Sequence, residues 1–273
     1  MLAPHPERKK NEGGKLLRAH EPPPVLVERP ASTTPFFITV DHASSRFPEV
    51  LGDLGVSKDE RERHIAWDIG ALGVAQRLAA TFMATLVATQ YSRLVIDCNR
   101  HAWREDLIPS LSEFTEIPGN VNIEPEARAL RQRELYEPYH AEIRRLLDAR
   151  LARQQATLYL SMHSFTPCYK GQARPWQIAM LSNRDRRVAE ILLRELGRDS
   201  ALCVGDNIPY RLTDEGDYGI PVHAEQRGLP HVLIELRQDE ITDERGQAQW
   251  ADRLAPLLAL AACELGISNY RRD

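Results

Sequence analysis

The sequence predicts an α/β protein with a mostly parallel or mixed central sheet and helices on both faces. Short runs rich in β-branched and aromatic residues, such as 36–40 and 158–162, are typical of buried strands. Stretches with apolar residues at helical spacing, such as 65–82, alternate with these runs. Such an alternation favours a sheet that is covered by helices on each side.

The predicted elements follow one another from residue 36 onward. Strands are expected at 36–40, 85–89, 94–98, 158–162, 177–181 and 231–236. Helices are expected at 65–82, 125–154, 187–196 and 247–265. The second of these is a helix pair or one helix kinked near Pro138, because proline lacks the N–H that a helix interior needs. Segments 105–124 and 206–221 contain proline and glycine with little periodicity, so we predict long loops that wall a site.

Composition limits the classes of function. Residues 1–33 are charged and contain several prolines, which predicts a polar, flexible or surface-hugging leader before one catalytic domain at 34–273. A net charge of −4 gives no electrostatic argument for binding nucleic acid or a membrane surface. No apolar stretch approaches the roughly 18 residues of a membrane span. The N-terminus also lacks the apolar segment of a signal peptide, so the cytoplasm is the expected location. None of the 4 cysteines forms a CxxC pair, which excludes a zinc finger or thioredoxin motif.

Four of the predicted strands end in polar residues. These are His42, the pair Asn99 and Arg100, His163, and Glu235. In an open α/β sheet, ligands bind just beyond the carboxyl ends of the strands. Polar groups at such positions are costly unless they satisfy one another or bind a ligand. We therefore expect these residues to share one site.

The residue types in this set suit metal-assisted hydrolysis. Catalytic zinc commonly takes two histidines and a carboxylate and keeps one position for water, which suits His42 and His163. A glutamate such as Glu235 can pass a proton from water to a leaving amine. An arginine beside an asparagine, as at Asn99 and Arg100, can hold a substrate carboxylate.

Several short segments in order carry a resemblance to a known family. They are Asp-His-Ala-Ser-Ser-Arg-Phe-Pro (41–48), His-Ile-Ala-Trp-Asp-Ile-Gly-Ala (64–71), Ser-Arg-Leu-Val-Ile-Asp-Cys-Asn-Arg (92–100), His-Ser-Phe-Thr-Pro (163–167), Arg-Pro-Trp (174–176), Asp-Asn-Ile-Pro-Tyr (206–210) and Ile-Glu-Leu-Arg-Gln-Asp (234–239). Over residues 36–258 the series resembles the N-formylglutamate amidohydrolase family. The resemblance implies a fold similar to zinc carboxypeptidases and aspartoacylase. It also implies zinc on His42 and His163, a carboxylate on Asn99 and Arg100, and Glu235 as general base.

The same resemblance implies the reaction. The expected substrate is a small anionic N-acyl amino acid such as N-formyl-L-glutamate, which releases formate, and the family name suggests histidine breakdown. Neither nucleic acid nor a membrane is an expected partner, and the sequence leaves the oligomeric state open. One alternative is a carboxypeptidase-like enzyme or deacylase that acts on a peptide or cell-wall fragment. A second is a non-catalytic binding protein with the same fold.

The sequence leaves the third metal ligand open. Zinc carboxypeptidases place a glutamate three residues after the first histidine, and this chain has Ser45 there. Asp68 is the candidate ligand, although the dipole of a helix equally explains a carboxylate at its start. Asp41 is a second candidate and is better suited to orienting a histidine. Iron, cobalt or manganese would suit the donors as well as zinc.

Two further residues are predicted to bind substrate. His223 lies between the 206–221 loop and the 231–236 strand. It could stabilise an oxyanion or bind substrate, or it could be a surface loop histidine. Arg174 precedes Pro175, and a residue before proline favours an extended chain. Arg174 is therefore either a carboxylate contact or part of a packed turn.

Overall fold

The computed structural model describes residues 14–267, which contain one seven-stranded sheet. Its strands are β1 (Val25–Glu28), β2 (Phe36–Val40), β3 (Thr85–Thr89), β6 (Leu158–Phe165), β9 (Ile178–Leu181), β10 (Val204–Asp206) and β11 (His231–Arg237). Their order across the sheet is β1-β3-β2-β6-β11-β9-β10. The central strands β3, β2, β6 and β11 run parallel, whereas β1 and β9 run antiparallel to their neighbours β3 and β11. The sheet is therefore mixed, with a parallel centre.

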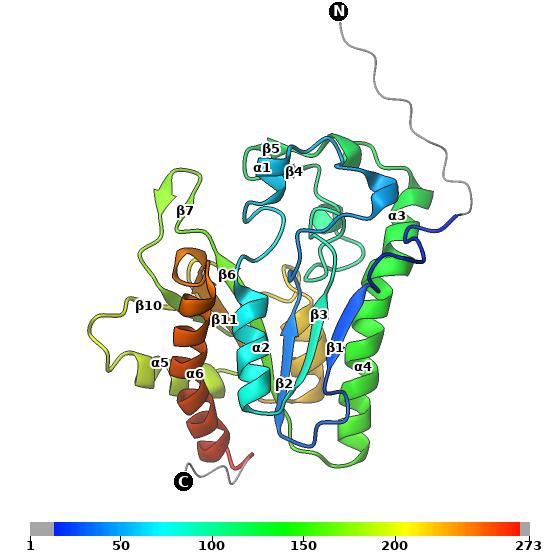
Figure 1. The fold of residues 1–273 in the computed structure, drawn as a ribbon. Helices are drawn as coiled ribbons and strands as arrows, with labels where there is room; N and C mark the ends of the chain where they lie inside the picture. The colour runs from blue at the N-terminus through cyan, green and yellow to red at the C-terminus, as the bar shows by residue number, and fades with distance from the viewer. Residues whose placement is uncertain (1–13, 268–273) are drawn as a thin grey trace, which may run out of the picture.

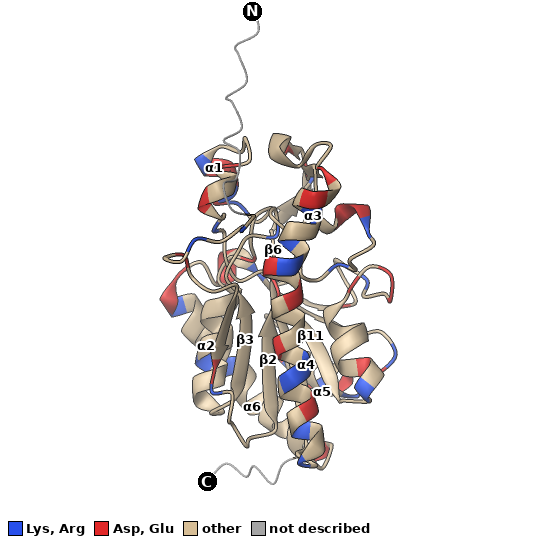
Figure 2. Cartoon of the chain, turned by 90° about the vertical axis from the view of Figure 1, so that its right-hand side faces the viewer, with Lys and Arg blue, Asp and Glu red and all other residues tan. Residues whose placement is uncertain are grey.

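Helices cover both faces of this sheet (Figures 1 and 2). One face packs against α2 (Ala71–Thr81), α5 (Arg187–Leu196) and α6 (Glu244–Glu264). The other packs against α3 (Pro125–Arg131) and α4 (Glu137–Ala152). Side chains of β2 alternate between the two layers, because successive residues of a strand point to opposite faces. The arrangement confirms the predicted fold class.

Shorter elements connect these layers. Two small hairpins pair β4 (Leu111–Ser112) with β5 (Thr115–Glu116) and β7 (Cys168–Tyr169) with β8 (Gln172–Ala173). Short helical segments lie at α1 (Lys58–Arg61), Glu49–Leu51, Glu105–Leu107, Pro118–Asn120, Gly219–Ala224, Glu225–Arg227 and Gln238–Glu240. None of the helices within residues 14–267 is long and apolar enough to cross a membrane.

The apolar run at 94–98 was predicted as a strand, and this prediction is wrong. The backbone N–H of Val95 donates to the carbonyl of Ser92 at 2.9 Å, and that of Leu94 donates to Ser92 Oγ at 3.1 Å. These bonds form a turn, while Leu94 and Val95 are still buried in the core. A short apolar run indicates burial but does not by itself distinguish a strand from a buried turn.

Helix α2 begins at Ala71, whereas the sequence predicted a start at residue 65. Gly70 precedes it with φ of 78°, and a Cβ there would lie 2.1 Å from the carbonyl oxygen of Ile241. Glycine alone tolerates this conformation and this close approach. Asp68 therefore lies in the turn before the helix rather than in its first turn.

The helical stretch at 125–154 is continuous, and the break predicted at Pro138 takes another form. A π-helical segment, Gln132–Tyr136, joins α3 to α4 and ends two residues before the proline. The wider turn accommodates a residue that has no N–H to donate. The other predicted helices and strands agree with the structure apart from their ends. Strands β6 and β11 extend further than predicted, so His163 lies within β6 rather than after it, and Glu235 lies two residues before the end of β11.

Part of the predicted leader belongs to the folded body. Strand β1 lies within it and pairs with β3 at the edge of the sheet, with Val25 opposite Thr89. Leu16 is buried, and its backbone N–H donates to Glu134 at 2.8 Å. This is a correction for residues 14–33, and the rest of the predicted leader, residues 1–13, lies outside the described residues.

Candidate metal centre and active site

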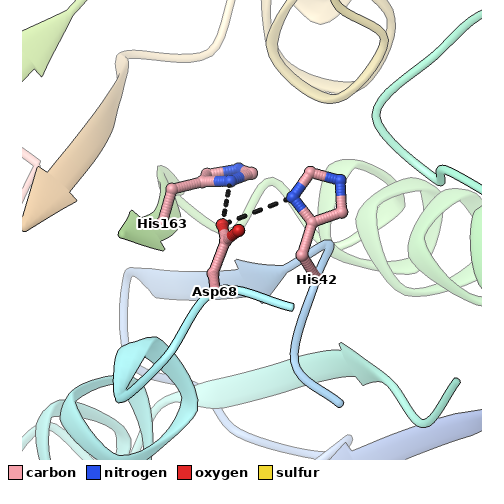
Figure 3. Close-up of side chains that lie close together, drawn as sticks. All are labelled: His42, Asp68 and His163. Carbon is pink, nitrogen blue, oxygen red and sulfur yellow. Dashed lines mark hydrogen bonds and ion pairs between the residues drawn. The ribbon is translucent and has the colours of Figure 1, made fainter. Parts of the chain in front are cut away.

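Two imidazoles and one carboxylate meet near the carboxyl ends of the central strands β2 and β6 (Figure 3). His163 Nδ1 lies 2.8 Å from Asp68 Oδ2, and His42 Nδ1 lies 3.3 Å from the same oxygen. One donor atom from each residue lies within 4.8 Å of the others. The three side chains are almost fully buried. The structure thus places the three residues that were predicted as metal ligands next to one another.

The fold explains why residues so far apart in sequence meet here. Strands β2 and β6 are parallel neighbours, with Thr39 opposite Ser161, so His42 and His163 both lie near the carboxyl ends of these strands. Backbone hydrogen bonding holds the Asp68 turn against this end of the sheet. The N–H of Asp68 donates to the carbonyl of His42 at 2.9 Å. The Asp68 turn is therefore fixed directly to the residue that supplies the first imidazole.

A second set of carboxylates bonds to the outer nitrogens of both histidines. His42 Nε2 lies 2.7 Å from Asp97 Oδ1, and His163 Nε2 lies 3.1 Å from Asp41 Oδ2. Arg93 in turn donates to Asp97 Oδ2 at 2.7 Å. A carboxylate on the outer nitrogen fixes the orientation of a ligating imidazole and raises its basicity. This arrangement directs Nδ1 of both rings toward Asp68.

The carboxylates decide the charge of the imidazoles. For His42, burial lowers the pKa, but Asp97 and Asp68 together outweigh it and the pKa lies above its usual value. For His163, burial also lowers the pKa, and the bonds to Asp41 and Asp68 raise it well above the usual range. The pKa of Asp68 stays below its usual value, since the two imidazoles outweigh its burial. The site is therefore built from closely paired charges.

Glu235 lies beside this cluster. It is directly opposite His163 in the β11–β6 pairing, and its side chain is buried. Its Oε2 atom has no hydrogen-bond partner within residues 14–267. Burial, partly offset by the cationic His163, raises the pKa of Glu235 to about 7. A carboxylate with a free oxygen and a pKa near neutrality can both accept and donate a proton.

The cluster opens into a cavity of about 810 Å³. Polar and cationic side chains line much of it besides the cluster and Glu235. They include Arg93, Asn99, Arg100, Arg174, Tyr210, Arg211 and Asp217. The guanidinium groups suit an anionic ligand.

Asn99 and Arg100 line the cavity, but Asn99 already has protein partners. Its Oδ1 accepts hydrogen bonds from the backbone N–H groups of Tyr218 and Gly219 at 3.0 and 2.9 Å. Its Nδ2 donates to Asp217 at 3.0 Å. Arg100 donates through Nη1 to the carbonyl of the neighbouring loop residue Gly216 at 2.8 Å. Asn99 therefore ties the loop to the site, and the loop in turn holds Arg100.

Arg174 sits among aromatic rings at the cavity wall. Its guanidinium carbon lies 4.7 Å from the ring centroid of Tyr169 and 4.8 Å from that of Tyr210. Its Nη1 donates to the hydroxyl of Tyr210 at 2.8 Å. Two neighbouring rings hold a planar cation in place while its edge can still form hydrogen bonds.

His223 does not line this cavity. It is buried beside α4, and its Nε2 lies 2.9 Å from Nδ1 of His140. Burial lowers the pKa of His223 to about 3. The structure therefore separates it from the cavity-lining residues. Its position in the sequence could not reveal this, because the segment Gly219–Ala224 is helical rather than a surface loop.

Sequence reasoning missed the role of Arg93 and Asp97. If 94–98 were a strand, these residues would be about 13 Å apart, at about 3.3 Å per residue. In the observed turn, their side chains form an ion pair at 2.7 Å. The spacing of four residues between opposite charges was the available signal, and the expected strand concealed it.

Comparison with known proteins decides the family. The sequence profile of N-formylglutamate amidohydrolase matches residues 34–242. The chain belongs to the N-formylglutamate amidohydrolase family. Membership of this amidohydrolase family indicates an enzyme that hydrolyses an amide. Comparison with curated protein sequences gives no match.

Solved structures agree with the family assignment. A gene product of Agrobacterium tumefaciens is 35% identical, with a TM-score of 0.89, and the match covers 92% of this chain and 100% of that one. N-formylglutamate amidohydrolase from Ralstonia eutropha JMP134 is 20% identical, with a TM-score of 0.64, over 87% of this chain and 97% of that one. The second likeness supports the shared fold of the family.

Proposed function

We propose that this member of the N-formylglutamate amidohydrolase family is a metal-dependent enzyme. It removes the formyl group, or another small N-acyl group, from an acidic amino acid such as N-formyl-L-glutamate. The observation that carries the proposal is the meeting of His42, Asp68 and His163 beside the buried Glu235, whose Oε2 lacks a partner within the described residues. We further propose one cytoplasmic catalytic domain at residues 34–273, to which β1 adds an edge strand.

The donor set fits a divalent metal. His42, Asp68 and His163 would hold the ion, and two imidazoles with one carboxylate are a common set for catalytic zinc. When bound, the ion lowers the pKa of water and polarises a carbonyl. Charge balance also favours binding of a divalent ion in place of protons. An ion of charge +2 that replaces one proton on each of the two imidazoles leaves the total charge unchanged.

Glu235 supplies the proton transfers in this proposal. In its ionised form, it accepts a proton from the attacking water as the new C–O bond forms. It then gives that proton to the amine nitrogen as the C–N bond breaks. The pKa of about 7 suits both steps, because a group that must gain and lose one proton works best near its own pKa.

Arg100 and Arg174 are proposed to bind the carboxylates of the substrate. Both line the cavity, and Arg174 is oriented by the rings of Tyr169 and Tyr210. Fixed guanidinium groups lose little freedom when a carboxylate binds. Asn99 acts differently in this proposal, since its amide already holds the loop that contains Gly216 and Asp217.

The test is formate release from N-formyl-L-glutamate by purified protein of known metal content. We expect turnover with zinc, loss of turnover with a chelator, and recovery when metal is restored. The variant E235Q keeps the metal and loses turnover about 10²- to 10⁴-fold. Turnover of a peptide or another N-acyl amino acid alone would keep the chemistry and change the substrate. Absence of turnover on all of these by metal-loaded protein would refute the proposal.

A further inference from the structure

Two small hairpins outside the central sheet overhang the cavity. The β4–β5 hairpin supplies Leu111, Ser112 and Glu113 to its lining, and the β7–β8 hairpin supplies Tyr169 and Gln172. Figure 1 shows both hairpins beyond the same end of the sheet. The cavity is lined by residues of both hairpins together with His163 and Glu235. They come from segments more than 50 residues apart, as the separation of 57 between Glu113 and Lys170 shows. Contacts between them therefore contribute to their relative position.

The side chain of Glu113 makes the main contact between the hairpins. Its Oε1 accepts a hydrogen bond from the backbone N–H of Lys170 at 3.1 Å. In the same region, the ammonium of Lys170 lies 6.0 Å from the ring centroid of Phe114 and 5.5 Å from that of Tyr169. The turn of one hairpin is thus joined to the turn of the other.

Residues near α1 hold the Glu113 carboxylate from its other side. Its Oε2 forms an ion pair with Arg63 and lies 3.5 Å from His64 Nε2. The side chain is only 7% exposed, although it belongs to a hairpin turn. Glu113 also has φ of 56°, in the left-handed region that a residue with a side chain rarely adopts. A buried, fully bonded carboxylate on an unfavourable backbone is typical of a position with a specific task.

The contact extends to the proposed substrate anchor. Tyr169, beside Lys170 in the second hairpin, is one of the rings against which Arg174 stacks. Arg174 directly follows β8, and its N–H donates to the carbonyl of Pro167 at 2.8 Å, which closes the base of the hairpin. Movement of this hairpin would therefore move a wall of the cavity and loosen the packing of Arg174.

We propose that Glu113 is a specificity-determining positioning residue. By joining the two hairpins above the cavity, it restricts the site to a single amino acid with a small N-acyl group. The proposal rests on the proposed function. Glu113 takes no part in the proton transfers, so its loss changes which substrates enter and how tightly they bind rather than the chemical step.

The experiment compares E113A, E113Q and the control E116A in metal-loaded protein. Glu116 lies in the same hairpin, is exposed and does not line the cavity. The probes are N-formyl-L-glutamate, N-hexanoyl-L-glutamate and N-formyl-L-glutamyl-L-alanine. For E113A we expect kcat/KM for the small substrate, relative to at least one larger substrate, to fall about tenfold, which is the effect of losing one charge-assisted hydrogen bond. The loss comes from KM, with kcat for the small substrate retained. E113Q keeps an acceptor for Lys170 and loses less selectivity, and E116A matches the wild type.

Hydrogen exchange provides a readout that needs no substrate. We expect backbone amides of residues 168–173 to exchange faster in E113A than in wild type, with those of β6 and β11 unchanged. Unchanged exchange would overturn the contact itself. Faster exchange with unaltered selectivity, or an equal loss of kcat for all substrates, would overturn the specificity role. If the wild type hydrolyses no N-acyl amino acid, the proposed function fails, while the exchange experiment still judges the contact.

Discussion

Within residues 14–267, two pairs of buried histidines have the same distance between their rings but opposite shifts in pKa. The rings of His42 and His163 have centroids 5.1 Å apart, and so do those of His140 and His223. Carboxylates bond to both nitrogens of each ring in the first pair and raise the pKa of both. Within residues 14–267, no carboxylate bonds to either ring of the second pair.

The second pair is held neutral by its surroundings. Tyr136, Tyr139 and Tyr218 contact the ring of His140. Burial and the adjacent His223 lower the pKa of His140 well below its usual value. Burial alone therefore makes a histidine a neutral packing residue, whereas a carboxylate on the outer nitrogen makes it suited to bind a metal.

The largest expected effect separates the two pairs directly. We expect H163A to lose its metal and to lose turnover by more than about 10³-fold, since several kcal/mol of stabilisation depend on the ion. H223A is the matched variant, and it should retain the metal with a lower melting temperature. Metal analysis by mass spectrometry and formate assays measure both. Equal loss of metal in the two variants would contradict the distinction between the pairs.

The next effect tests the outer carboxylate. We expect D41N to weaken metal binding by about 10- to 100-fold, because it removes the charge that orients His163 and raises its basicity. Competition with a chelating dye measures the affinity. Y139F is the control, since it removes only the hydrogen bond that Tyr139 donates to Asp41 at 2.6 Å and leaves the charge. A larger loss in Y139F than in D41N would show that the hydrogen bond from Tyr139, not the charge of Asp41, is decisive.

The pH profile tests the proton acceptor beside the first pair. Burial raises the pKa of Glu235 to about 7, and the group must be ionised to accept a proton from water. We therefore expect kcat/KM to fall below pH 7, approaching about tenfold per pH unit. The assay needs excess metal, with metal content checked at each pH, so that protonation of the imidazoles does not produce the same decline. A flat profile between pH 5 and 7 would exclude Glu235 as the base.

The smallest expected effect concerns stability without metal. His223 has its pKa lowered to about 3 in the folded state, so unfolded chains bind its proton first as the pH falls. Its contribution to stability is therefore lost from about pH 6.5 downward to about 3. For His42 and His163 the pKa is raised, so their contribution is present at low pH and is lost as the pH rises through the folded pKa.

Chemical denaturation of metal-free protein measures this difference. As the pH falls from 6.5 to 4.5, we expect the free energy of unfolding of H223Q to decrease by on the order of 1 kcal/mol less than that of wild type, because glutamine does not titrate. H20Q is the control, since His20 lies at the surface with 66% of its side chain exposed. An identical pH dependence in wild type and H223Q would show that the second pair is not held neutral.

Much of the architecture could be predicted from local patterns. Strands β2 and β3 are short, continuously buried runs rich in β-branched or aromatic residues, and helix α5 has an amphipathic period, so their type and limits follow from the sequence. The strand prediction at 94–98 was wrong because burial in a turn produces the same apolar pattern as burial in a strand. For the site, the order of short motifs indicated His42, Asp68, His163 and Glu235. The same reasoning could not show that His223 bonds to His140 outside the cavity lining, or that Asn99 is already bonded to a loop.

The fold class, the family resemblance and the residue types available for chemistry can be read from the order of residues along the chain, because periodicity and motif order are local properties. Which histidine meets which carboxylate follows from the folded arrangement. Asp41, Asp68 and Asp97 lie within 56 positions of one another, yet Asp41 and Asp97 each bond to one imidazole nitrogen and Asp68 bonds to two, only because β2, β6 and two turns converge. Charge and pKa depend on distances of about 3 Å across the fold, and spacing along the chain does not encode them.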